Sequence, residues 1–153
     1  MGGSTSKKVV IQRFDRESIR GVVNPASYLR AEGVEVLTQS GSLMTLPYGE
    51  VKAVCFVRDY EATPGAPEKR LFHARPKMEG LWVRMRFQDG ELMDGLLANS
   101  LLEIQPFGFT VVPPNPSSNN QRIFVPRAAL RDFHVLAVIG SPLRPRRTTA
   151  KAA

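Results

Sequence analysis

VVIQRF at residues 9–14 and WVRMRF at residues 82–87 agree in length, in alternation and in their final Phe. The agreement continues at three further pairs of places along the chain: Gly21 and Gly95, Gly33 and Gly108, Pro47–Lys52 and Pro126–Arg131. Recurrence of this kind defines the repeating unit before residue propensities are considered. The sequence therefore predicts two tandem copies of one small domain.

Short alternating stretches predict strands in both copies. Val10 and Phe14 are expected to face the core of the first copy, and Val83, Met85 and Phe87 that of the second. The later strands are predicted at 33–38, 42–46 and 53–57 in the first copy, and at 107–112, 121–125 and 132–138 in the second. Five short strands per copy predict an all-β fold of two tandem five-stranded small barrels, related by internal duplication and packed as a pseudo-dimer.

Prolines punctuate both copies at the same place. Pro47 and Pro126 close the fourth strands, and Val51 and Leu130 follow four residues later as apolar anchors. A proline that presets φ before a re-entering strand predicts a single 3₁₀ turn.

The changes in composition divide the chain into five segments. They are a flexible leader at 1–7, the first barrel at 8–57, a linker or strap at 58–80, the second barrel at 81–141 and a disordered basic tail at 142–153. Leu71 and Phe72 stand beside His73 in the otherwise polar linker, and we expect them to form a strap, strand-like in part, that packs across one or both barrels.

The order of predicted elements resembles the small-barrel superfold shared by Sm-like proteins and Src-homology-3-type domains. Asp89-Gly90 followed by Gly95 is similar to the loop and glycine of the first Sm motif. The stretches 80–84 and 122–127 are similar to an uncharacterised bacterial domain family found with signalling modules. The resemblance implies a fold but no activity, because the fourth-to-fifth-strand turn lacks the characteristic nucleotide-binding residues of Sm proteins.

The net charge of +7 is concentrated at the two ends of the chain. Six of the 21 Lys and Arg residues lie in 1–8 and 144–153, which contain no Asp or Glu. The rest of the chain therefore carries 15 basic and 14 acidic residues. A nearly neutral body has little of the counterion-release affinity that dominates nucleic-acid binding.

Candidates for catalysis are few. His134 falls at the position of Cys55 in the other copy, which favours a variable strand position over a nucleophile and its base. The one Cys and two His have no metal-ligand spacing. We therefore expect no enzyme, cofactor or metal. One cysteine also excludes an intrachain disulfide and predicts a cytoplasmic protein, and no apolar run is long enough to predict a membrane span.

Two surfaces are candidates for binding. The first is the predicted outward face of the opening strands, which is too apolar for a solvated surface and is expected to form the inter-repeat contact or a partner surface: Val9, Ile11, Arg13, Trp82, Arg84 and Arg86. Its arginines are expected to pair with Asp94, Glu91 or a linker acid. The second is a possible ligand patch around the insertion that distinguishes the second copy: Arg75, Lys77, Asn119, Asn120, Arg122 and Arg127.

These features favour a noncatalytic binding or adaptor module for a protein or peptide in bacterial signalling or regulation, since exposed strand edges accept extended segments. A nucleic-acid or cyclic-dinucleotide binding protein is the alternative, and an enzyme of unknown type is the third. The expected state is a monomer with a pseudo-twofold, or a weak homo-oligomer.

Overall fold

Ten β-strands and three single-turn 3₁₀ helices are formed in the computed structural model of the protein, which describes residues 5–60, 71–114 and 120–140. The first half contains β1 (Lys7–Gln12), β2 (Ile19–Val23), β3 (Val34–Thr38), β4 (Leu43–Leu46), η1 (Tyr48–Glu50) and β5 (Ala53–Val57). The second half contains β6 (Gly80–Phe87), β7 (Leu92–Leu97), η2 (Leu101–Glu103), β8 (Gly108–Val112), β9 (Asn120–Pro126), η3 (Arg127–Ala129) and β10 (Leu130–Ile139). The predicted all-β class is confirmed, and no helix in these ranges has the length and apolarity to cross a membrane.

The proline-led turns occur where the sequence predicts them. Pro47 caps η1 and Pro126 caps η3, with φ of −56° and −62°. Proline holds φ near these values, so both turns begin without strain. The chain then re-enters the sheet as β5 or β10, which confirms the predicted fifth strands. The tail predicted at 142–153 lies outside the described residues, as do residues 1–4 of the leader, while Lys7 already belongs to β1.

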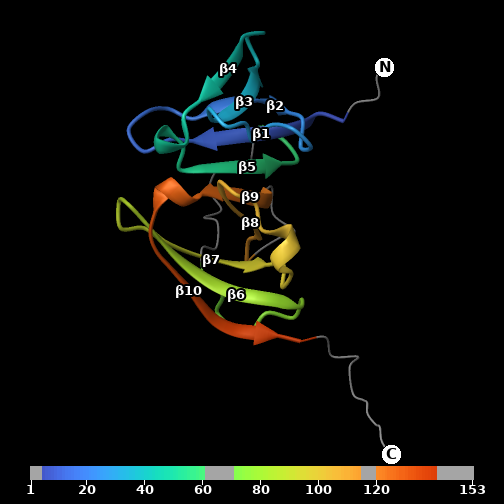
Figure 1. The fold of residues 1–153 in the computed structure, drawn as a ribbon, viewed down its shortest axis with the longest axis vertical. Helices are drawn as coiled ribbons and strands as arrows, with labels where there is room; N and C mark the ends of the chain where they lie inside the picture. The colour runs from blue at the N-terminus through green and yellow to red at the C-terminus, as the bar shows by residue number, and fades with distance from the viewer. Residues whose placement is uncertain (1–4, 61–70, 115–119, 141–153) are drawn as a thin grey trace, which may run out of the picture.

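All ten strands form one antiparallel sheet in the order β10-β6-β7-β8-β9-β5-β1-β2-β3-β4 (Figure 1). The pair β5 and β9 joins the first half to the second. Within the described chain β4 pairs only with β3 and β10 only with β6, so these two strands are the edges of an open sheet. Two separately closed barrels are therefore not confirmed, and a continuous ladder runs through both halves.

The strands follow the same order in each half, β5-β1-β2-β3-β4 and β10-β6-β7-β8-β9. Glycines occupy matching places in the two orders. A Cβ added at Gly33 would lie 2.0 Å from the carbonyl oxygen of Leu46, and one added at Gly108 would lie 2.3 Å from that of Val125. Only a residue without a Cβ fits so close to the neighbouring backbone, which explains why both positions are Gly.

The pairing corrects the alignment of the opening strands by one residue. Val9 lies opposite Gly21 and Val83 lies opposite Gly95, so Val9 corresponds to Val83 and not to Trp82. A shift of one residue exchanges the two faces of a strand. The sequence left this register open because Val9, Val10 and Ile11 are all apolar, and alternation does not then select a face.

Each half has its own hydrophobic core, and the two central strands contribute to both. Val54 and Phe124 belong to the core of the first half, whereas Cys55 and Ile123 belong to that of the second. Successive residues of a strand point to opposite faces, so the two cores lie on opposite sides of the sheet at β5 and β9. Strands buried on both faces have continuous apolar runs, and AVCFV in β5 is such a run.

The predicted pseudo-twofold contact through the opening strands is wrong. Val9 and Ile11 are fully buried in the core of their own half, and the halves meet instead through β5 and β9. A twofold contact would pair the same element from each half. Here the fifth strand of the first half pairs with the fourth strand of the second, which is a head-to-tail arrangement.

Candidate binding surfaces

The two edge strands carry most of the exposed large apolar side chains of the described residues. On β4 these are Leu43 and Met44, and on β10 they are Val135, Leu136 and Val138. Leu43 is 68% exposed and Val135 is 51% exposed. An edge strand also has a row of backbone N–H and C=O groups that no neighbouring strand bonds. Apolar side chains beside such backbone groups suit the addition of a further strand.

β10 is held firmly against the second half on its inner side. It runs for ten residues beside β6, with two bulges, after Leu130 and after Val135. The ring of Phe133 stacks on that of Phe109 with the ring centroids 4.3 Å apart. The strand is therefore a rigid edge, and a segment that pairs with it does not have to order it first.

The outer face of the second half is occupied by the chain's own connector. Asp94, on β7, is fully buried and accepts hydrogen bonds from Arg84 Nε at 2.7 Å, from Trp82 Nε1 at 3.1 Å and from the amide of Phe72 at 3.1 Å. Phe72 also meets Trp82 edge to face, with their centroids 5.8 Å apart. The expected pairing of an arginine with Asp94 is confirmed, and so is the packing of the connector, but as an irregular segment over one half.

Electrostatics make this cluster a structural anchor. Burial alone would raise the pKa of Asp94, but the hydrogen bonds from Arg84, the Phe72 amide and Trp82 outweigh it and hold the pKa below the usual value. The carboxylate is therefore ionised at neutral pH and fixes the connector to β6 and β7. Trp82 and Arg84 are thus engaged within the chain.

The other residues of the predicted outward face have separate roles. Arg13 donates from Nε and Nη2 to the carbonyl oxygen of Glu17, at 3.0 and 2.8 Å, and so supports the β1–β2 loop. Arg86 Nε lies 3.4 Å from Asp132 on β10, and both side chains are substantially exposed. With Val9 and Ile11 in the core, the six residues do not form one surface.

The predicted ligand patch does not converge either. Arg75 and Lys77 line a pocket of about 370 Å³ under the connector, whereas Arg122 lines a different one. Arg127 follows the far end of β9, with its guanidinium 4.8 Å from the ring centroid of Phe109. Arg122 lies opposite Phe56 within β9, whereas Arg127 begins η3 and contacts Phe109, so the two arginines have separate surroundings. Asn119 and the side chain of Asn120 lie outside what the structure describes.

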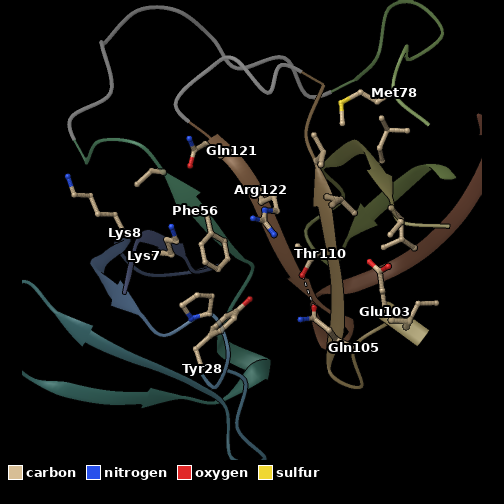
Figure 2. Close-up of a pocket in the computed structure, with 18 of the residues that line it drawn as sticks. Lys7, Lys8, Tyr28, Phe56, Met78, Glu103, Gln105, Thr110, Gln121 and Arg122 are labelled. Atoms are coloured by element: carbon tan, nitrogen blue, oxygen red, sulfur yellow. Dashed lines mark hydrogen bonds between the residues drawn. The ribbon is translucent and has the colours of Figure 1, made fainter. Parts of the chain in front are cut away.

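A cleft of about 730 Å³ crosses the junction between the halves, and the sequence did not predict it. Figure 2 shows Lys7, Lys8, Tyr28 and Phe56 on the wall from the first half, facing Glu103, Gln105 and Thr110 from the second, with Arg122 between them. Burial raises the pKa of Tyr28 far above its usual range, although Arg122 and the Thr110 hydroxyl act in the opposite direction. Of these residues, only Arg122 belonged to the predicted ligand patch. The cleft itself could not be predicted, because it forms where β5 pairs with β9.

A lysine ties the halves together on another side. Lys52, which precedes β5, donates from Nζ to Asp89 Oδ2 at 2.7 Å and to Glu91 in the β6–β7 hairpin. Burial lowers the pKa of Lys52, but these hydrogen bonds more than compensate, and its pKa is raised overall. The hairpin carboxylates are therefore partners of the first half.

The candidates for catalysis stay apart. Cys55 is buried on β5, where it lies opposite Ile123 of β9. His134 is exposed on β10, where it lies opposite Arg84 of β6, and four strands separate β5 from β10 in the sheet. No group of three or more His, Cys, Asp or Glu side chains among the described residues is arranged to hold a metal ion.

Comparison with known proteins identifies one relationship. The model of a family of unknown function (DUF6982) matches residues 5–137, and the chain belongs to this family. No curated protein and no solved structure matches the chain.

Proposed function

We propose that this chain, as a member of that family, is a noncatalytic binding module that takes up an extended protein segment on the exposed edge of β10. The observation that carries the proposal is the row of exposed Val135, Leu136 and Val138 on a strand whose outer side pairs with no other described strand. Strand addition uses backbone hydrogen bonds for affinity and alternate side chains for specificity. β10 offers both.

We further infer that the two halves are copies of one five-stranded unit of the small-barrel type. Support comes from the identical strand order, from the matched glycines Gly33 and Gly108, and from the two Pro-led 3₁₀ turns. The single cysteine, which is buried, supports a reducing compartment, and we propose the bacterial cytoplasm as the place of action.

The test for strand addition is selection of binders from a phage-displayed library of random peptides on the immobilised full-length chain. Selected peptides are expected to lose about tenfold or more in affinity when Val135→Lys or Val138→Lys places a charge on the edge. Leu102→Lys is the matched control, because Leu102 is 98% exposed but lies in η2, away from both edges. Peptides that bind equally well to the β10 variants would overturn the proposal.

Binding of an anionic ligand, such as a nucleic acid or a cyclic dinucleotide, is the second candidate. The cleft favours it because Lys7, Lys8, Arg122 and the aromatic ring of Tyr28 all line it, although Glu79 and Glu103 also line the space. A labelled single-stranded oligonucleotide and a cyclic dinucleotide, each titrated at low and high salt, test this function. It predicts salt-sensitive binding that Arg122→Glu abolishes and Arg20→Glu, outside the cleft, preserves.

An enzyme of unknown type stays third. The positions of Cys55 and His134 give it no support, because a nucleophile needs its base within hydrogen-bond reach.

A further inference from the structure

At the junction between the halves, a strand of one half adds to the sheet of the other half. β5, a fifth strand, accepts β9, a fourth strand, in antiparallel register. The opposed pairs are Val54 with Phe124, Cys55 with Ile123 and Phe56 with Arg122. Both strands become buried on both faces as a result.

The chain has a second pair of strand edges equivalent to those of β5 and β9. No other described strand pairs with these two edges. β10 is the fifth strand of the second half, and β4 is the fourth strand of the first half. Each half thus has one exposed strand edge that is equivalent to one side of the β5–β9 junction. Figure 1 shows β4 and β10 at opposite ends of the longest axis, so one chain cannot bring its own two edges together.

Shared pairing partners show which residues of β10 correspond to those of β5. Val54 lies opposite Ile11 and Phe133 lies opposite Met85, while Val9 lies opposite Phe56 as Val83 lies opposite Val135. Phe133 is therefore the counterpart of Val54, and Val135 that of Phe56.

The correspondence between β4 and β9 follows in the same way. Met44 lies opposite Val36 and Ile123 lies opposite Val111, with Val36 and Val111 in the cores of their halves. Met44 is thus the counterpart of Ile123, and its neighbour Leu43 is the counterpart of Arg122.

We propose that β10 of one molecule pairs with β4 of a second copy, head to tail, in the register of the β5–β9 junction. Phe133 then lies opposite Thr45, His134 opposite Met44 and Val135 opposite Leu43 of the neighbouring copy. This inference rests on the proposed function, because it names the segment that β10 accepts. A contact between two different surfaces of the same chain is heterologous and builds rings or open filaments.

The side chains favour this contact. Leu43 and Val135, 68% and 51% exposed, cover each other where the internal junction has Arg122 and Phe56. β4 carries no charged residue in LMTL, so His134 of the neighbouring copy meets an uncharged strand. Burial of these apolar groups and pairing of two rows of backbone groups drive association together.

Sedimentation velocity of the full-length chain over a range of concentrations tests the proposal. The wild-type protein is expected to grow in mass beyond a dimer as its concentration rises. Val135→Lys blocks β10 and Leu43→Lys blocks β4, so each variant alone is expected to be a monomer. Mixed in equal amounts they are expected to form a dimer that grows no further, because each variant supplies the edge that the other has lost.

The mixture also shows that both variants are folded, since each must still pair. Leu102→Lys is the control and should assemble as the wild type does. A wild-type chain that stays monomeric at every concentration overturns the proposal, as does a Leu43→Lys variant that assembles like the wild type. If the chain is monomeric and selected peptides still bind β10, only the self-pairing fails; if peptides also ignore β10, the proposed function fails with it.

Discussion

β5 and β10 occupy the same place in their halves but have opposite environments. β5 is buried along nearly its whole length between β1 and β9, whereas most residues of β10 are exposed beyond β6. Their compositions follow this difference, since β5 is entirely apolar and β10 includes Asp132 and His134. Burial is therefore decided by the position of each half in the continuous sheet, and not by the strand order that the halves share.

The connector adds a second difference between the halves. Asp94 and Arg20 are counterparts, because Asp94 precedes Gly95 in β7 as Arg20 precedes Gly21 in β2. Arg20 is exposed, whereas Asp94 is fully buried beneath Phe72 and Trp82. A segment outside the repeated strands has thus turned a surface position into a buried anchor.

The largest effect is expected at the junction. Phe124→Ala removes a fully buried ring from β9 and should cost about 3–5 kcal/mol in the free energy of unfolding. Its counterpart in β4 is exposed Thr45, and Thr45→Ala should change stability by about 0.5 kcal/mol or less. Urea unfolding monitored by circular dichroism measures both. Equal losses at the two positions would contradict the contrast between junction and edge.

A smaller effect is expected at the connector anchor. Asp94→Asn removes the charge that binds Arg84 and should cost about 1–3 kcal/mol, because one of the two acceptor oxygens becomes an NH2 group that faces the same donors. Arg20→Asn creates the same residue at the counterpart position and should be nearly neutral. Limited proteolysis reports on the connector directly, and cleavage near Phe72 should accelerate only in Asp94→Asn. Unchanged cleavage would show that the connector is held by other contacts.

The smallest effect concerns pH. Asp94 has a lower pKa in the folded protein than its usual 3.8, so it contributes stability above that value and loses it as the pH falls toward the folded pKa. As the pH is lowered below about 5, the Tm of the wild type should therefore decrease, and more steeply than that of Asp94→Asn. Asp89, whose pKa is also lowered by Lys52, contributes in the same direction and remains in both proteins. Parallel Tm curves would show that Asp94 is not responsible.

The local elements could be predicted because short-range rules govern them. Pro47 and Pro126 preset φ for the 3₁₀ turns, and apolar alternation marks Val83, Met85 and Phe87 as inward-facing. Asp94 was one of three acidic partners that the sequence suggested for the arginines of this face, and the structure pairs it with Arg84. The face of Val9 and Ile11 could not be predicted in the same way, because three consecutive apolar residues fit either register.

The binding surfaces were less predictable than the strands. The sequence grouped four basic residues into one patch, but the structure separates them. Arg75 and Lys77 line the pocket under the connector, Arg122 lines the cleft between the halves, and Arg127 contacts Phe109. The sequence did not predict the cleft beside Tyr28, which forms only where the halves meet.

Local sequence was enough to predict the all-β class, the matched glycines and turns, and two similar halves, because these depend on neighbouring residues and on backbone stereochemistry. The pairing of β5 with β9, which leaves β4 and β10 as edges, became known from the folded chain alone. The physical reason is that strand partners are chosen by side-chain packing between distant segments, and the alternation within one strand carries no information about which strand lies beside it.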